Sequence, residues 1–465
     1  MAYKNYTKEQ SSIHVDEGQQ FTITIKKMGI NGEGIGYYQR KLVFVPGALP
    51  SEKVRVEVEE DLYKFIRAKL VEVLVKSKDR IKPVDDYANS VGGFELENLA
   101  YPAQLEYKNQ VISDSLAKFE PAGYRKYKIL PPIGMDNPVG YRNKATFQLR
   151  EQDGKVIAGL YKHRSHEVVD LQTSALQYPL VMKIMRGVVQ MIDNLHIPVY
   201  NEDQNSGIIK TLVVRVAKAT NEAQITFITQ SQKLLKKHQL IEQIQADFPE
   251  VVSIMQNVNP GKTSLVWGDQ MIHLAGKESI VEEINGLKFD LSARAFLQVN
   301  SFMTPTLYQE AFKALDLKGD EKLVDAYSGV GTIGLSLANK VREVRGMDII
   351  AESVHDANIN AVKNGITNAI YEVGEAEKLL PAWLADGFKP SALVVDPPRT
   401  GLADPLIDAI LESMPKKFVY ISCNPSTLAR DLVKLTEKYV VEYIQSVDIM
   451  PQTSRVECVV KFRRK

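Results

Sequence analysis

From about residue 322 onward, the chain alternates short apolar runs with helical patterns, and a polar residue ends or follows each run. The runs cover residues 323–325, 344–348, 392–395 and 418–421. Consecutive parallel strands need long crossover connections, which helices usually provide. The alternation therefore predicts an α/β domain of the doubly wound, Rossmann-like type, in which ligands bind at the carboxyl ends of the strands.

Two regions of different character precede this domain. Residues 21–26 and 54–59 alternate apolar and polar side chains, as half-buried strands do, and glycines separate such runs. Short strands with glycine corners predict a small OB-like β-barrel. Helical spacing at 99–119 and 180–195 is then mixed with strand-like runs, which favours an α+β domain. We expect domains at 15–76, 77–290 and 291–465.

The composition excludes several classes of protein. Cys423 and Cys458 are the only cysteines, which excludes a disulfide framework and an all-cysteine zinc or iron–sulfur site. A net charge of +1 argues against a uniformly basic nucleic-acid binder but allows a local basic patch. The sequence has no signal-peptide pattern and no apolar stretch of membrane-spanning length. We expect a cytoplasmic protein with no membrane association and no bound metal.

A glycine-rich segment follows the first strand of the predicted α/β domain. Residues 329–334 match the pattern G-x-G-x-x-G, with Gly329 and Gly331 at its start. Asp348 ends the next strand, where a carboxylate can hydrogen-bond a ribose hydroxyl. The pair predicts a nucleoside cofactor, either a dinucleotide or S-adenosylmethionine. The alternative is a glycine turn beside a solvated aspartate.

Polar residues also follow the last two runs. The sequences Asp-Pro-Pro-Arg at 396–399 and Ser-Cys-Asn-Pro at 422–425 both come directly after apolar strands. Both should lie at the carboxyl edge of the sheet, near the cofactor. Lone cysteines are usually core residues. Cys423, placed after a strand and between Ser422 and Asn424, fits a partly exposed nucleophile better.

Near the end of the chain, one carboxylate interrupts an apolar run. We expect residues 456–460 to form a strand, with Glu457 and Cys458 on opposite faces. Glu457 is then either an exposed edge residue or a site residue with a raised pKa. Cys458 is expected to pack in the core.

Together, these motifs resemble those of the RNA uracil-C5 methyltransferases. The matching stretches are Phe-Leu-Gln-Val-Asn at 296–300, Asp-Ala-Tyr-Ser-Gly-Val-Gly at 325–331, the two motifs at 396–399 and 422–425, and Arg-Val-Glu-Cys at 455–458. The N-terminal barrel resembles the TRAM domain that many members carry. The resemblance runs from about residue 18 to the end of the chain, and it implies S-adenosylmethionine as the methyl donor.

The resemblance also implies catalytic roles. Uracil C5 is a poor nucleophile, so a thiolate adds to C6 and makes C5 nucleophilic enough to attack a sulfonium methyl group. Cys423 matches the family's nucleophile. Glu457 matches the general base that removes the C5 proton, after which the thiol can leave.

Further residues match the family's binding pockets. Phe296 would stack on an extruded base, and Arg399 could stabilise the thiolate or a developing oxyanion. Glu375 is either a cofactor contact or a surface carboxylate. The cofactor and base pocket would otherwise be lined by Gln298, Tyr327, Asp348 and Asp396, with the turn glycines Gly329 and Gly331.

One departure from the family is informative. Many ribosomal-RNA members carry iron–sulfur ligands of the kind C-x5-C-G-G-C before the central domain. Residues 85–96 keep the paired glycines at 92 and 93 but lack every cysteine. We expect no iron–sulfur cluster.

Two basic clusters in the central region are candidate RNA contacts. The first contains Arg142 and Lys144, and the second covers residues 162–166. Phosphate contacts need such groups. Read singly, each cluster is more often a solvated surface.

We expect methylation of uridine C5 in structured RNA. The preferred substrate is 23S ribosomal RNA, because TRAM-bearing members mostly act there, and cluster-free members can modify two sites. A transfer-RNA T-loop uridine is the alternative substrate. Other classes are a nicotinamide-dependent dehydrogenase and a non-catalytic RNA-binding protein. No protein partner is implied.

Overall fold

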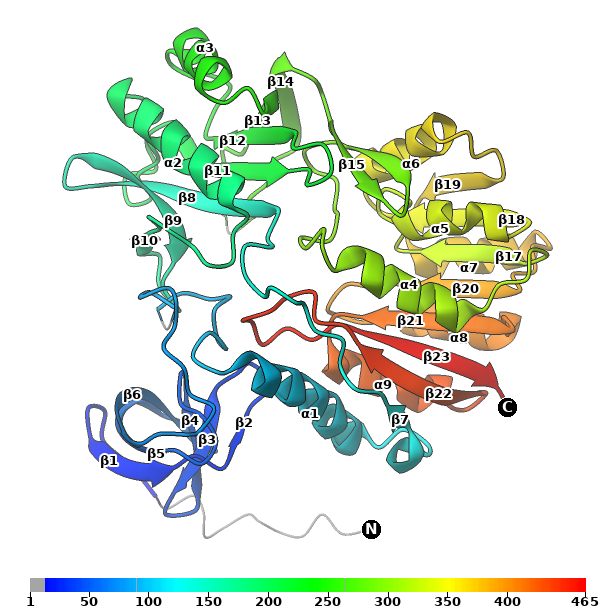
Figure 1. Ribbon diagram of the computed structural model, residues 1–465, viewed down its shortest axis with the longest axis horizontal. Coiled ribbons are helices and arrows are strands. Elements are labelled where there is room, and N and C mark those ends of the chain that lie inside the picture. The colour runs from blue at the N-terminus through cyan, green and yellow to red at the C-terminus, as the bar shows by residue number, and fades with distance from the viewer. Residues whose placement is uncertain (1–12, 89, 264) are drawn as a thin grey trace. The chain divides into compact units, whose positions relative to one another are not determined.

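The computed structural model describes residues 13–88, 90–263 and 265–465 (Figure 1). Its contacts divide the chain into two compact units. One unit contains the described residues up to 111 together with 450–455, and the other contains 112–449 and 456–465. The three domain ranges expected from the sequence stay a prediction.

The first unit contains a six-stranded sheet in the order β1-β5-β6-β4-β3-β2. Val43, Val54, Val56 and Ile66 are fully buried at its centre, and the alternation of buried and exposed residues along β5 follows the sequence pattern. Its strands are β1 (Gln20–Thr24), β2 (Lys27–Met28), β3 (Gly34–Tyr38), β4 (Lys41–Val45), β5 (Lys53–Asp61) and β6 (Phe65–Val75). Helix α1 (Tyr101–Phe119) follows.

A seven-stranded sheet occupies the middle of the chain, in the order β10-β9-β8-β11-β12-β13-β14. Helix α2 (Pro179–Asn194) packs its apolar face against β9 and β11. The strands are β8 (Lys144–Gln152), β9 (Lys155–Tyr161), β10 (Val168–Asp170), β11 (Ile209–Val216), β12 (Ala223–Thr229), β13 (Val251–Val258) and β14 (Gln270–Gly276). Helix α3 (Lys237–Asp247) and the hairpin of β15 (Ile280–Ile284) and β16 (Leu287–Leu291) complete this region.

The C-terminal region contains an eight-stranded sheet in the order β19-β18-β17-β20-β21-β23-β22-β7 (Figure 1). Strands β17 to β21 are mutually parallel, as the alternation predicted, and β23 is antiparallel to β21. The strands are β7 (Lys128–Ile129), β17 (Lys322–Ala326), β18 (Glu343–Asp348), β19 (Ala369–Val373), β20 (Ala392–Val395), β21 (Lys417–Ser422), β22 (Tyr439–Ser446) and β23 (Cys458–Arg464).

Helices connect the parallel strands of this sheet. Helix α4 packs against β21 and β23, and α6 packs against β18 and β19. The α-helices are α4 (Thr304–Leu315), α5 (Thr332–Leu337), α6 (Ala351–Lys363), α7 (Ala376–Ala385), α8 (Asp404–Ser413) and α9 (Pro425–Leu435). Short 3-10 turns lie at η2 (Tyr124–Lys126) and η3 (Ala338–Lys340). The carboxyl ends of β17, β18, β20 and β21 therefore share one edge.

Candidate active site

The loop after β17 is shaped by left-handed backbone conformations. Tyr327, Gly329 and Gly331 have φ angles of 64°, 52° and 81°. A Cβ atom at Gly331 would lie 2.9 Å from Cζ of the buried Tyr371, so this position has no room for a side chain. A sharp turn of this kind lets a ligand approach the backbone closely.

Asp348, the last residue of β18, is bonded to this loop. Its Oδ2 accepts a hydrogen bond from Gly329 N at 3.0 Å, and its Oδ1 accepts one from Ile350 N at 2.9 Å. Each carboxylate oxygen has two lone pairs, so Asp348 can still accept from a ribose hydroxyl. The next residue, Ile349, is 67% exposed and offers an apolar surface beside it.

A second carboxylate near this loop has no place among the site residues expected from the sequence. Asp325 lies within β17, is buried, and accepts a hydrogen bond from Gly334 N through Oδ2 at 2.8 Å. Its Oδ1 is buried and has no hydrogen-bond partner among the described residues. Burial, and then the charge of Asp348, raise the pKa of Asp325 to about 7. An aspartate inside an apolar strand was the signal that could have found it.

The segment before α4 lies beside the glycine loop. An ideal Cβ at Gly329 would be 3.7 Å from the carbonyl oxygen of Phe296. The Phe296 side chain is 58% exposed, whereas Gln298 is buried. Asn143 holds this segment through hydrogen bonds from Nδ2 to Gln298 O at 3.3 Å and to Ser301 Oγ at 2.7 Å. Phe296 is therefore an exposed aromatic ring on an anchored backbone.

Cys423 follows β21 and is half-buried, and its Sγ lies 3.8 Å from the carbonyl oxygen of Pro397. Burial raises the pKa of the Cys423 thiol to about 12, with smaller contributions from Glu457 and Asp396, while Arg399 acts in the opposite direction. The four side chains are therefore near enough to interact electrostatically. Arg399 is the cation that favours a thiolate here.

Glu457 lies at the same edge, although the strand there begins later than expected. Strand β23 starts at Cys458, so the expected strand 456–460 was wrong at its first two residues. Glu457 is 4% exposed, and its Oε1 has no hydrogen-bond partner in the described part of the chain. Burial and Asp396 raise its pKa well above the ordinary value. The sequence left open an exposed edge residue or a site residue with a raised pKa; the structure shows Glu457 buried with a raised pKa, and its role in the site stays a prediction.

Asp396 interacts electrostatically with residues on both sides of this edge: with Asp325 near the glycine loop, which we call the cofactor side, and with Cys423 and Glu457, which we call the thiol side. Burial, followed by the charge of Asp325, raises its pKa to about 7. It affects the pKa of both Cys423 and Glu457. The sequence motifs after β17, β20 and β21 thus come together with Glu457.

For three other expected site residues, the structure shows contacts with residues other than Asp325, Asp396, Cys423 and Glu457. Glu375 is exposed at the start of α7 and forms an ion pair of 2.7 Å with Lys378. The Lys144 Nζ lies 5.5 Å from the centre of the Trp267 ring, and burial and Arg215 lower the pKa of Lys144 to about 6. Arg142 is half-buried, with backbone bridges to Gln177 and Asn300.

Comparison with known proteins assigns the family. The model of the tRNA (uracil-5-)-methyltransferase family matches residues 100–465, and that of the TRAM domain matches 15–71. The chain belongs to the tRNA (uracil-5-)-methyltransferase family. It is an RNA uracil-C5 methyltransferase that uses S-adenosylmethionine, and its substrate is RNA. The dehydrogenase and the non-catalytic RNA-binding protein considered from the sequence are therefore wrong.

Similar proteins cover nearly the whole chain. An uncharacterized RNA methyltransferase of Lactiplantibacillus plantarum is 58% identical over 98% of this chain and 95% of its own length. One from Enterococcus faecalis is 53% identical over 97% of this chain and 99% of its own. The crystal structure of Pyrococcus abyssi tRNA (uracil-54, C5)-methyltransferase with S-adenosyl-L-homocysteine has a TM-score of 0.77 at 24% identity, covering 95% of this chain and 100% of that one. This last match shows that the fold is shared.

Two further properties concern metals and membranes. Among the described residues there is no group of three or more His, Cys, Asp or Glu side chains that could hold a metal ion. No helix in the described ranges is long and apolar enough to cross a membrane.

Proposed function

We propose that this methyltransferase modifies uridine C5 in 23S ribosomal RNA, at one or two positions, through a covalent bond between Cys423 and uracil C6. The observation that carries the covalent mechanism is the grouping of Cys423 with Arg399 and the buried, incompletely bonded Glu457 at one sheet edge. With this substrate, we also propose a cytoplasmic location for the enzyme.

The cofactor side of the edge fits S-adenosylmethionine. The free Oδ1 of Asp325 is an acceptor for a donor group of the ligand, and Asp348 can accept from a ribose hydroxyl. Gln298, Tyr327 and the backbone at Gly329 and Gly331 would complete the pocket, with Asp396 between it and the thiol. When bound, S-adenosylmethionine supplies the methyl group.

The residues of the thiol side would act in order. Cys423 adds to C6 as a thiolate, which places electron density on C5 and on the carbonyl oxygen at C4. After C5 has gained the methyl group, Glu457 removes the C5 proton, and the C6–S bond breaks to release the thiolate. Phe296 would stack on the extruded base, and Arg142 and Lys144 are candidate contacts to the RNA backbone.

Because the pKa of the Cys423 thiol is raised, the site has to promote ionisation of this thiol before it can react. With a pKa of about 12, the thiol is almost entirely un-ionised at pH 7. The negative charges of Glu457 and Asp396 oppose ionisation of the thiol, and Glu457 has to carry its charge when it accepts the C5 proton. Arg399 is exposed at the same edge and favours the thiolate. Binding of the base beside Arg399 is the step at which we expect the thiolate to form.

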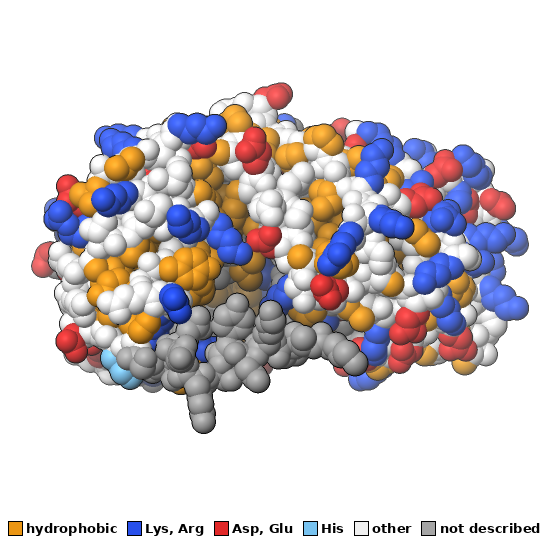
Figure 2. Space-filling model, turned by 90° about the horizontal axis from the view of Figure 1, so that it is seen from below, with side chains coloured by type: hydrophobic (Ala, Val, Ile, Leu, Met, Phe, Trp, Pro, Cys, Tyr) orange, Lys and Arg blue, Asp and Glu red, His pale blue; other side chains and the backbone are white. Residues whose placement is uncertain are grey.

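Transfer RNA is a second candidate substrate, and one observation favours it. The Pyrococcus abyssi tRNA enzyme matches 95% of this chain, which includes most of the N-terminal barrel. The barrel therefore does not by itself separate the two substrates. On the face in Figure 2, acidic and basic side chains are intermixed, so RNA binding depends on local groups.

The decisive experiment supplies radiolabelled S-adenosylmethionine with unmodified 23S rRNA fragments or unmodified tRNA. We expect methyl transfer to the rRNA fragments; transfer to tRNA alone would overturn the substrate proposal. RNA containing 5-fluorouridine has no C5 proton to remove, so it should trap a covalent complex that needs both the cofactor and Cys423. Glu457→Gln should trap the same complex with ordinary RNA, and methylation by Cys423→Ala at the normal rate would overturn the mechanism.

A further inference from the structure

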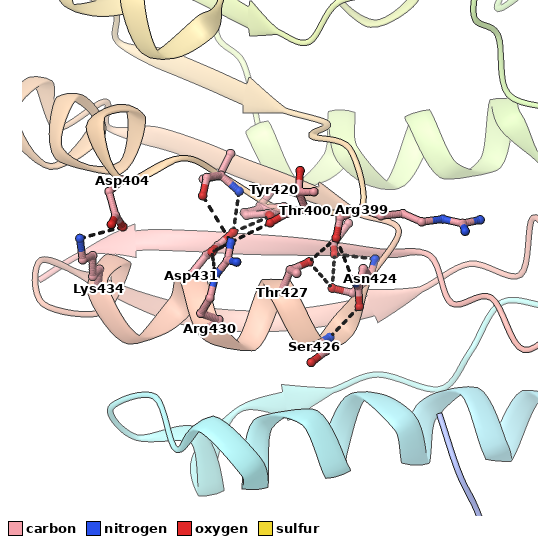
Figure 3. Close-up of polar contacts among 12 residues, drawn as sticks. Arg399, Thr400, Asp404, Tyr420, Asn424, Ser426, Thr427, Arg430, Asp431 and Lys434 are labelled. Atoms are coloured by element: carbon pink, nitrogen blue, oxygen red, sulfur yellow. Dashed lines mark hydrogen bonds and ion pairs between the residues drawn. The ribbon is translucent and has the colours of Figure 1, made fainter. Parts of the chain in front are cut away.

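The loop that carries Arg399 is tied to helix α9 by hydrogen bonds along its backbone (Figure 3). The carbonyl oxygen of Arg399 accepts from Asn424 Nδ2 at 2.8 Å and from Thr427 Oγ1 at 3.2 Å. The carbonyl oxygen of Thr400 accepts from Arg430 Nη2 at 2.8 Å. Leu402 N donates to Asp431 Oδ2 at 2.8 Å. Three residues of one loop are therefore fixed by four side chains of one short segment.

Asp431 is the centre of this arrangement. It is 2% exposed, and its Oδ1 accepts two hydrogen bonds from Arg430, from Nε at 2.9 Å and from Nη2 at 2.7 Å. Its Oδ2 accepts from Leu402 N and, at 2.9 Å, from the hydroxyl of Tyr420. Tyr420 is fully buried in β21, three residues before Cys423. Asp431 thus joins the Arg399 loop to the strand that carries the thiol.

The packing around Asp431 leaves no room for a side chain at Gly401. Gly401 has a φ of 76°, and a Cβ atom there would lie 2.6 Å from Asp431 Oδ2 and 2.7 Å from Arg430 Nη2. Figure 3 shows the Arg399 side chain directed away from this network, while its backbone belongs to it. The guanidinium is therefore free for the site, and its position depends on the loop.

We infer that Asp431 is a positioning residue: with Arg430 and Tyr420 it fixes the backbone of residues 399–402 and so holds the Arg399 side chain beside the Cys423 thiol. The inference rests on the proposed function, in which Cys423 is the nucleophile and Arg399 favours its thiolate. Charged and titratable groups that act on the thiol are Glu457 and Asp396, which oppose ionisation, and Arg399, which favours it.

The test measures the reactivity of the thiol without RNA. The full-length protein is treated with iodoacetamide at fixed pH, and alkylation of the Cys423 peptide is followed by mass spectrometry. A shift of one pKa unit changes the thiolate fraction about tenfold. We expect Asp431→Asn and Arg399→Gln each to slow alkylation by about three- to tenfold, and Tyr420→Phe, which removes one bond, by about twofold.

Two features separate positioning from other effects. Loss of the negative charge, or easier access of iodoacetamide to the thiol, would speed alkylation; slower alkylation in Asp431→Asn is therefore the result expected when Arg399 is no longer held in place. The double variant should react no more slowly than Arg399→Gln alone, because both changes act through one guanidinium. An unchanged or faster reaction in Asp431→Asn, or additive slowing in the double variant, overturns the inference.

A matched control lies on the same helix. Lys434 of α9 forms an exposed ion pair of 2.8 Å with Asp404 and has no bond to residues 399–402. Lys434→Ala should alkylate at the normal rate, and slowing there would overturn the inference. The measurement involves no methyl transfer. Failure of the nucleophile proposal would appear as activity in Cys423→Ala, whatever the alkylation rates are.

Discussion

Asp325 and Asp431 are both buried aspartates of the region around the eight-stranded sheet, and their hydrogen bonds differ. Asp325 accepts one hydrogen bond through Oδ2, and its Oδ1 is unpartnered within the described structure. Asp431 accepts four hydrogen bonds, two on each oxygen. Burial raises the pKa of both carboxyls, and in Asp431 these donors act in the opposite direction.

The difference indicates different functions for the two aspartates. An unsatisfied buried acceptor costs about 1–3 kcal/mol, and such groups are typical of sites that bind ligands. A carboxylate that already accepts two hydrogen bonds on each oxygen has little capacity to bind a ligand, so its role is to stabilise the surrounding structure. The cofactor side thus contains left-handed backbone and an open carboxylate, whereas the loop that carries Arg399 is held by a carboxylate whose hydrogen bonds are saturated.

The largest expected effect is on the pH dependence of stability. The pKa of Asp325 is about 7 in the folded protein against an ordinary value near 4, so the folded state binds its proton more tightly. This contribution is fully present below about pH 4 and is lost as the pH rises to about 7. Asp325→Asn should remove a pH-dependent loss of up to about 4 kcal/mol, seen in urea unfolding between about pH 3 and 8.

Asp431→Asn tests the carboxylate whose hydrogen bonds are saturated. It removes an acceptor with charge-assisted bonds to Arg430, so we expect it to destabilise the protein by about 2 kcal/mol at neutral pH. Asp325→Asn should stabilise under the same conditions. If both variants shift the free energy of unfolding in the same direction, the distinction between the two aspartates is wrong.

The next prediction compares the loss of stability caused by alanine at two glycines of the cofactor side, Gly331 and Gly329. Gly331→Ala places an L-residue at φ 81° and brings its Cβ within 2.9 Å of the Tyr371 ring, so we expect a loss of about 2 kcal/mol or more. Gly329→Ala meets no atom closer than 3.7 Å and should lose about 1 kcal/mol. Calorimetric titration with S-adenosylmethionine should show weaker binding in the same order.

These glycine variants also test whether the two sides are separable. Alkylation of Cys423 should proceed at the normal rate in both, because neither glycine contacts the loop at 399–402 in the described hydrogen bonds. Equal losses of cofactor affinity and thiol reactivity would show that the two sides form one unit.

The smallest effect concerns a single bond on the thiol side. Thr427→Val removes the hydroxyl, which lies 3.2 Å from Arg399 O and 3.1 Å from Asn424 O and can donate its one proton to either, while Asn424 Nδ2 still donates to Arg399 O. We expect a loss of about 0.5–1 kcal/mol in stability and a two- to threefold lower kcat, with the affinity for S-adenosylmethionine unchanged. A change in cofactor affinity without a change in kcat would contradict the assignment of Thr427 to the thiol side.

Sequence analysis predicted the parallel sheet and the motifs at its edge because both depend on local patterns. Apolar runs with helical connections predict parallel strands, and the G-x-G-x-x-G pattern predicts a loop after the first of them, where Gly329 and Gly331 do have left-handed backbone. Local patterns could not predict three other features: the order of the strands, the start of β23 at Cys458 and the surroundings of Lys144. They depend on partners far away in the chain.

The sequence by itself determined the α/β fold, the family and the polar residues that follow the strands, since strand periodicity and motif spacing are properties of neighbouring residues. Only the tertiary structure decided that Glu457 is buried with a free oxygen, that Asp325 is open and that Asp431 is saturated. The physical reason is that burial and hydrogen-bond saturation are set by contacts between distant residues. Leu402 and Asp431, which are 29 positions apart, are an example.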